Sequence, residues 1–208
     1  MFEKKVVLNP IKSDCPFFNP LIEYANDFVR FLLKPYEMEG RYVEMETVEF
    51  VLQSAITVLK RLDATEGADE AYLTPHNLEV LLGNPTGKGK GMVLDLLHIS
   101  AKTPEEAKEN TTIASLFLNE YYSENSQFFS ATYPVYARLA LLNSSRWGRI
   151  LNPDPHKGEH NAITRELEDV MDIGFDVDWY EADTSRIEDD FTDFVEGLFY
   201  RFFLRAHF

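Results

Sequence analysis

The sequence predicts a mainly α-helical protein that folds as a single domain over residues 1–208, with one minor β element near residues 175–180. Apolar residues make up 45% of the 208 residues, which is enough for a sizeable core. Six segments begin with helix-starting residues and then repeat apolar side chains every three or four positions. A subdivision near residues 83–91, where glycine and lysine alternate, is the alternative domain arrangement.

The first two predicted helices begin near Asn19 and Arg41. Asn19 can cap a helix that Pro20 opens, and we expect Pro35 to end this helix because proline has no backbone N–H to donate. Residues 41–62 carry a longer apolar stripe, with acidic residues early and basic residues late, as the helix dipole favours. The stripe consists of Val43, Val48, Val51, Leu52, Ala55, Ile56, Leu59 and Leu62.

The next two predicted helices have well-marked starts. Thr74 precedes a proline, and Gly83 ends the short apolar segment that follows. Thr103 and Glu106 have the spacing of a capping box, in which each residue satisfies a free backbone N–H of the other. We expect the helix that they open to continue to about Asn125.

Proline and glycine mark the breaks in the helical pattern. Ser126 opens an apolar-rich segment that continues to Leu142, and Pro134 within it predicts a kink or a break. Residues 63–71 and 83–91 are predicted to be loops because they are rich in glycine and polar residues.

Three elements are predicted in the last part of the chain. Asp154 can cap a helix that ends before Gly174. Residues 175–180 alternate apolar and acidic side chains, which is the period of a half-buried strand. Thr184 or Ser185 then opens a final helix that continues to the chain end.

The final helix is apolar around most of its circumference near its end. Such a helix must be buried on all sides, either in the centre of its own domain or partly against another chain. The second interpretation makes this helix the contact of a homo-oligomer. One of its faces carries Ile187, Phe191, Phe194, Val195, Leu198 and Phe202.

Charge and targeting signals limit the partners and the compartment. With 20 Lys and Arg against 35 Asp and Glu, the formal net charge is −15, so direct nucleic-acid binding through a basic face is not expected. Cys15 is the single cysteine, and the N-terminus lacks the pattern of a signal peptide. No apolar run approaches the ~18 residues of a membrane helix. We therefore expect a soluble cytoplasmic protein that does not enter membranes.

The acidic residues concentrate near the C-terminus, where residues 161–200 hold 13 acidic side chains and two basic ones. A surface of this kind complements a basic surface on another protein. Our leading hypothesis is a non-catalytic acidic protein-binding module without a cofactor, of the inhibitor or immunity type, or one that imitates the phosphates of DNA. The predicted binding residues are Asp176, Asp178, Glu188, Asp189, Asp190, Asp193 and Glu196.

The alternative hypothesis is a zinc-dependent hydrolase. The run His156-x-x-Glu159-His160 resembles the motif of the inverted zinc proteases over five residues. If Asp154 starts a helix, the two histidines lie one turn apart on one face and can ligate zinc. The resemblance implies that the glutamate transfers a proton.

Two weaker patterns have simpler explanations. Residues 83–91 resemble a phosphate-binding loop, but no Ser or Thr follows a Gly-Lys pair, so a surface loop is the better interpretation. Arg201 and His207 have the spacing of a catalytic pair in some helical ribonucleases, but they lie at the chain end, where we expect solvated side chains.

Overall fold

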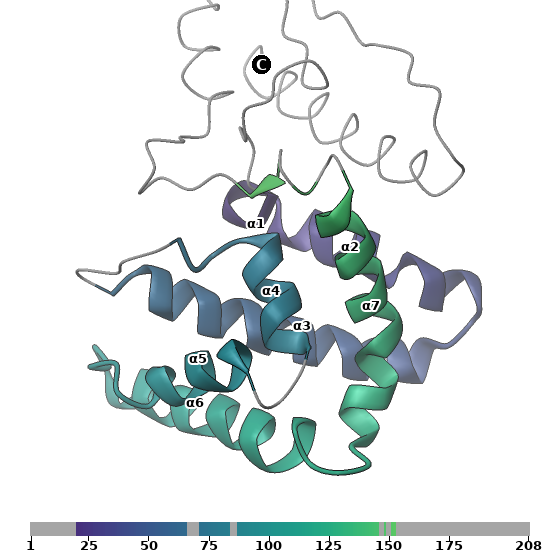
Figure 1. Cartoon of the computed structure of the whole chain (residues 1–208). Coiled ribbons are helices and arrows are strands. Elements are labelled where there is room, and N and C mark those ends of the chain that lie inside the picture. The colour runs from purple at the N-terminus through teal and green to yellow at the C-terminus, as the bar shows by residue number, and fades with distance from the viewer. Residues whose placement is uncertain (1–19, 66–70, 84–86, 146–147, 149–150, 153–208) are drawn as a thin grey trace, which may run out of the picture.

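The computed structural model describes residues 20–65, 71–83, 87–145, 148, 151 and 152 (Figure 1). These residues form seven α-helices and one π-helical segment, so the mainly α-helical class predicted from the sequence is confirmed for them. The predicted strand at residues 175–180, and the helices predicted to begin at Asp154 and near Ser185, lie outside the described residues. The assignment of the whole chain to one domain stays a prediction.

The N-terminal helices are α1 (Pro20–Glu23), α2 (Ala25–Met38) and α3 (Tyr42–Asp63). The prediction that Pro35 ends its helix is wrong, because α2 continues to Met38. Proline removes one hydrogen bond near the end of the helix, whereas the buried Tyr36 ring and its hydroxyl bond to the Ala131 carbonyl hold the last turn in place.

Helices α4 (Pro75–Leu82) and α6 (Pro104–Ser115) begin where the sequence predicts. The Thr74 hydroxyl accepts a hydrogen bond from the backbone N–H of Asn77 at 3.1 Å, and α4 ends at Gly83. The Thr103 hydroxyl likewise accepts from the Glu106 N–H at 3.1 Å, while the Glu106 carboxylate accepts from the Lys102 N–H at 3.0 Å. Both caps therefore satisfy backbone donors that a helix start leaves free.

Helix α5 (Lys88–Leu96) corrects the prediction of a loop at residues 83–91. Glycine disfavours helix, so the alternating glycines concealed this element in the sequence. Gly89 is needed because a Cβ at this position would lie 2.5 Å from the Val80 carbonyl oxygen and 3.0 Å from the Leu81 Cα. The missing side chain lets α5 cross closely over α4.

The segment after α6 also differs from the prediction. At Leu116 the α-helix changes to the π-helix η1 (Leu116–Tyr121), and Asn125 has a positive φ of 60°. The predicted end near Asn125 is therefore about one turn too late. Helix α7 (Gln127–Ser144) follows, capped by Ser126, and it runs on through Pro134 without a break.

Two neighbouring tyrosines tie η1 to the end of α4. The Tyr121 hydroxyl donates to the Leu82 carbonyl at 2.9 Å, and the Tyr122 hydroxyl donates to the Leu81 carbonyl at 2.7 Å. The last carbonyls of a helix have no partner within that helix. These two bonds therefore satisfy buried acceptors and tie η1 to α4. The π-helix also contacts α5, α6 and α7.

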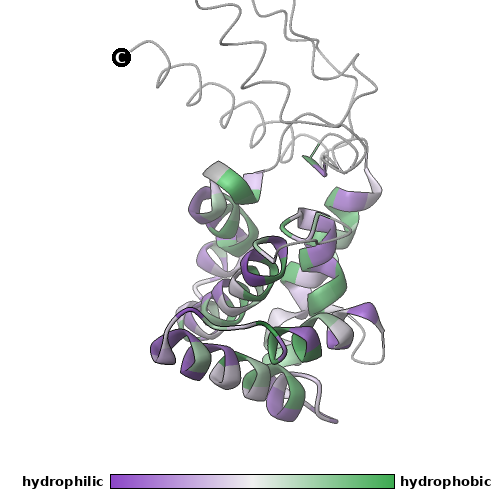
Figure 2. Cartoon of the chain, turned by 90° about the vertical axis from the view of Figure 1, so that its left-hand side faces the viewer, coloured by the Kyte–Doolittle hydropathy of each residue, from purple (hydrophilic) through white to green (hydrophobic). Residues whose placement is uncertain are grey.

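Helix α3 lies at the centre of the fold and packs against α2, α4, α5, α6 and α7 (Figure 1). Figure 2 shows apolar residues where the helices meet and hydrophilic residues on the outward turns. Helices on both sides of residues 84–86 contribute to one cluster of buried residues. The buried apolar residues of α3 are Val48, Val51, Leu52, Ala55, Ile56, Val58, Leu59 and Leu62.

Within the part of the chain that the structure describes, no helix combines the length and the apolar character that a bilayer crossing requires.

The close crossing of α4 and α5 gives a test by glycine substitution. Gly89→Ala should lower the free energy of unfolding by about 1–3 kcal/mol, because the added methyl group overlaps the α4 backbone. Gly91 is the matched control in the same helix, since a Cβ there meets no atom within 4 Å. Gly91→Ala should raise this free energy by about 0.5–1 kcal/mol. Urea denaturation measures both, and equal effects of the two substitutions would refute the crossing.

Candidate functional site

One side of α3 is covered only in part by the other described helices and lines three adjoining hollows. Successive residues on this side are separated by four and three positions in turn, so they form one stripe along the helix. With a rise of 1.5 Å per residue, the stripe is about 27 Å long. We call this stripe the α3 face: Val43, Thr47, Phe50, Ser54, Thr57 and Arg61.

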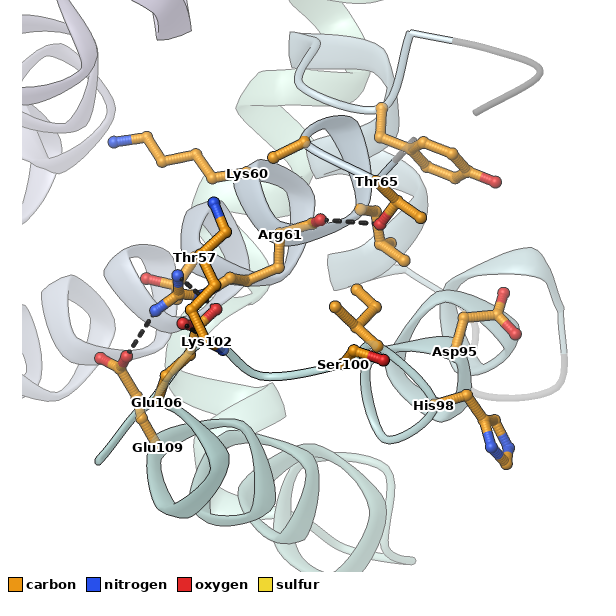
Figure 3. Close-up of a pocket in the computed structure, with 14 residues that line it drawn as sticks. Thr57, Lys60, Arg61, Thr65, Asp95, His98, Ser100, Lys102, Glu106 and Glu109 are labelled. Carbon is orange, nitrogen blue, oxygen red and sulfur yellow. Dashed lines mark hydrogen bonds and ion pairs between the residues drawn. The ribbon is translucent and has the colours of Figure 1, made fainter. Parts of the chain in front are cut away.

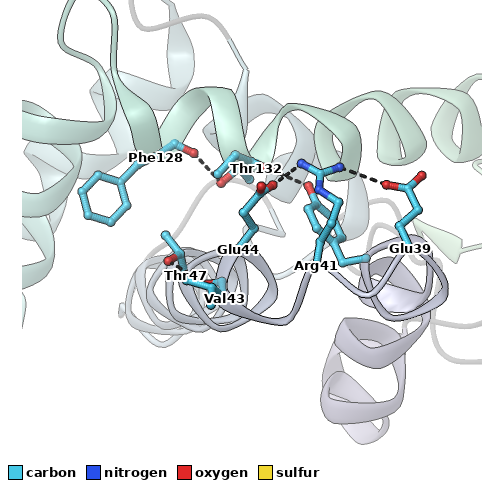
Figure 4. A network of polar contacts seen from close by, with 9 residues as sticks. Glu39, Arg41, Val43, Glu44, Thr47, Phe128 and Thr132 are labelled. Atoms are coloured by element: carbon cyan, nitrogen blue, oxygen red, sulfur yellow. Dashed lines mark hydrogen bonds and ion pairs between the residues drawn. The ribbon is translucent and has the colours of Figure 1, made fainter.

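The hollow at the N-terminal end of the α3 face has a volume of about 540 Å³ and lies between α3 and the start of α7. Val43 is 81% exposed there, although the sequence placed it with the core residues of α3. Arg41 pairs with Glu39 at 3.2 Å and with Glu44, and its guanidinium lies 4.9 Å from the centre of the Tyr36 ring (Figure 4). Hydrogen bonds to Glu44 and Glu39 raise the pKa of Arg41.

The middle hollow has a volume of about 450 Å³ and is the most apolar part of the site. It lies between α3 and the wall formed by α6 and η1, and Ile113 and Leu116 line that wall. Phe50 is 54% exposed at this hollow, whereas the neighbouring Ser54 is buried and small. Charged Glu105, Lys108 and Glu109 line the same hollow. A large exposed ring beside a hollow with an apolar wall and charged residues around it is typical of a surface that binds another protein.

The hollow at the C-terminal end is the largest of the three, about 990 Å³, and it shares Thr57 and Glu109 with the middle one. Arg61 forms ion pairs with Glu106 at 2.8 Å and with Glu109 at 3.0 Å (Figure 3). Lys60 points away from this cluster, and His98 and Asp95 lie on the opposite side of the hollow (Figure 3). The two carboxylates neutralise the guanidinium and link α3 to α6.

Acidic and basic side chains are equal in number around the three hollows, which distinguishes this side from a chain of net charge −15. Charge therefore gives the α3 face no general preference for cationic or anionic ligands. The acidic residues are Glu44, Asp95, Glu105, Glu106 and Glu109, and the basic residues are Arg41, Lys60, Arg61, Lys102 and Lys108.

The groups with strongly raised pKa values among the described residues are buried tyrosines with structural contacts. Burial raises the pKa of Tyr36 to about 12, against a smaller opposite effect of the Arg41 guanidinium. Burial also raises the pKa values of Tyr121 and Tyr122 above the ordinary tyrosine value. All three hydroxyls donate to backbone carbonyls, so they act as neutral donors that hold helices together.

The side-chain amide of Asn110 on α6 is buried and has no hydrogen-bond partner among the described residues. Its side chain is 3% exposed, and neither Nδ2 nor Oδ1 has a partner among the described residues. It lies one turn after Glu106, on the side of α6 that also buries Ile113. A buried amide without partners lowers the free energy of unfolding. An apolar residue at position 110 would therefore make α6, which forms the wall beside the α3 face, more stable.

The binding and metal-ligating residues predicted from the sequence lie outside the described residues. This holds for the acidic set from Asp176 to Glu196 and for His156, Glu159 and His160, so both hypotheses stay predictions. In the described part, His, Cys, Asp and Glu form no group of three that could hold a metal ion. Local sequence signals do not single out the α3 face, because the helical spacing marks Val43 as a core position of its helix although its side chain is exposed.

Comparison of the chain with protein-family models, with curated protein sequences and with solved structures found no match.

Replacing Asn110 tests the cost of its buried amide. Asn110→Leu should raise the free energy of unfolding by about 1–3 kcal/mol, because the leucine removes two unpaired polar atoms at similar volume. Asn77 is the matched control, a buried helical asparagine whose Nδ2 donates to the Ala71 carbonyl at 2.9 Å. Asn77→Leu should destabilise the protein. Chemical denaturation of the two variants gives the result, and a loss of stability in Asn110→Leu would contradict it.

The raised pKa of Tyr36 predicts a loss of stability at alkaline pH. An unfolded tyrosine ionises near pH 10, whereas the folded protein keeps Tyr36 neutral up to about pH 12. Between these values the unfolded chain binds fewer protons than the folded chain, so the free energy of unfolding falls as pH rises. Denaturation at several alkaline pH values should show a shallower fall for Tyr36→Phe than for the wild type. Tyr133→Phe, at an exposed position, should keep the wild-type slope. Equal slopes in all three proteins would refute the assignment.

Proposed function

We propose that the chain is a non-catalytic protein-binding module that binds a basic surface of another protein. The observation that carries this proposal is the separation of charge along the chain. Residues 153–208 contain 15 acidic and five basic side chains, so they carry most of the net charge of −15. The helical part, in contrast, surrounds its own core and pairs Arg41 and Arg61 with nearby carboxylates.

We infer that this acidic excess meets a partner of opposite charge. Complementary charge accelerates association and excludes partners of the wrong sign, whereas pairs at an exposed rim contribute little affinity. A partner that binds nucleic acid presents the basic surface that this chemistry requires. This supports the narrower proposal of an inhibitor, an immunity-type protein or an imitation of DNA, acting in the cytoplasm. We propose Asp176, Asp178, Glu188, Asp189, Asp190, Asp193 and Glu196 as the residues that bind the partner.

The α3 face is a second, independent observation that supports a role in protein binding. Exposed Phe50 and Val43 beside shallow hollows are the surface that proteins use for contacts with other proteins.

Charge reversal tests the proposed binding segment. The full-length protein is used at low salt to capture proteins from an extract of its native host, and a captured basic protein is purified. The variant Asp189→Lys, Asp190→Lys, Asp193→Lys should associate with it at least about tenfold more slowly, because steering acts through the rate of association. Wild-type association should also slow as salt rises, since the screening length is about 8 Å at physiological ionic strength.

A matched control changes the same amount of charge elsewhere. Glu37 on α2, Glu120 on η1 and Glu124 in the turn before α7 are exposed, and their reversal to lysine should leave the association rate close to that of the wild type. The proposal is wrong if the two triple variants bind alike, if wild-type association does not depend on salt, or if no basic protein is captured.

A further inference from the structure

We propose that the α3 face is the contact surface of a symmetric homodimer, in which α3 packs antiparallel against α3 of a second copy. This inference concerns different residues from the acidic segment and does not depend on the proposed function. It rests on the order of charges along α3, on the shape of the middle hollow and on the balance of charge around the site.

The charges along α3 are complementary to those of the same helix in the opposite direction. Exposed Glu46 and Glu49 lie on its N-terminal half, and exposed Lys60 lies on its C-terminal half, beside Arg61. A twofold axis near residue 52 places the acidic half of each copy opposite the basic half of the other. A parallel pairing would instead bring like charges together and would be repulsive.

The apolar residues match in the same arrangement. With the axis near residue 52, Phe50 of one copy lies opposite Ser54 of the other. Ser54 is small, and it lines the middle hollow with Thr57, Ile113 and Leu116. A large side chain opposite a small one is the pattern by which two helices interdigitate. Because the axis is twofold, this contact occurs twice in the dimer.

The arrangement of charge also reduces the repulsion between two copies at this surface. Two molecules of net charge −15 repel one another over most orientations. The linings of the hollows along α3 hold equal numbers of acidic and basic residues, and the exposed Glu46 and Glu49 beside them lie toward the basic half of the other copy, so the pairing reduces repulsion there. An isologous twofold contact is also the commonest form of homo-oligomer. The dimer would carry two acidic segments and could bind a repeated basic surface with higher avidity.

The oligomeric state of the full-length protein tests this inference. Sedimentation velocity over a range of micromolar concentrations should show a dimer for the wild type and a monomer for Phe50→Asp. Tyr133→Asp is the matched control, because Tyr133 on α7 and Phe50 have the same exposed fraction, 54%. The control variant should remain dimeric. A monomeric wild type, a dimeric Phe50→Asp or a monomeric Tyr133→Asp would overturn the proposal.

A charge exchange distinguishes the antiparallel pairing from other contacts through the same surface. Glu46→Lys with Glu49→Lys makes both halves of α3 basic, and Lys60→Glu makes both halves more acidic, so each variant alone should dimerise at least about tenfold more weakly. An equimolar mixture should recover dimers, because each basic half then meets an acidic half. Recovery also shows that both variants are folded. Absence of recovery would refute the antiparallel arrangement.

Dimerisation and binding of the basic partner can fail independently. Phe50→Asp should still bind the partner, because the acidic segment is unchanged. Loss of partner binding in the reversal of Asp189, Asp190 and Asp193 should leave the dimer intact.

Discussion

The packing of α3 is the constraint on which the rest of the fold depends. This helix contacts α2, α4, α5, α6 and α7, and its buried residues supply the part of the core that these helices share. Burial of a large aliphatic side chain contributes about 1.5–3 kcal/mol, so the inward sides of one long helix can organise several shorter ones. The short helices α4 and α5 have little stability alone and depend on this contact.

Polar bonds and one missing side chain then fix the arrangement around α3. Gly89 permits the close crossing of α4 and α5, and the hydroxyls of Tyr121 and Tyr122 satisfy the last carbonyls of α4. These contacts are specific in direction, unlike apolar burial, so they select one packing among several that would bury similar area. The π-helix η1 contributes to the same set of contacts, because it contains Tyr121 and Tyr122 follows it directly.

The other described helices cover one side of α3 only in part. Apolar Phe50 and Val43 remain exposed on that side beside hollows whose charges are balanced. The acidic residues near the C-terminus provide a second region of different chemistry. These two sets of residues differ in chemistry, since one combines exposed apolar side chains with hollows and the other carries charge.

The sequence by itself determined the helical class and the starts of α3, α4, α6 and α7, because caps and apolar spacing are local signals. Tertiary structure decided the features for which the local sequence predicts another structure. Pro35 lies within α2 because Tyr36 is anchored to α7, and the glycine-rich α5 is helical because it packs on α3 and α4. The α3 face was equally beyond the sequence, since spacing marks Val43 and Phe50 as apolar positions but only the placement of α6 and α7 decides that they stay exposed.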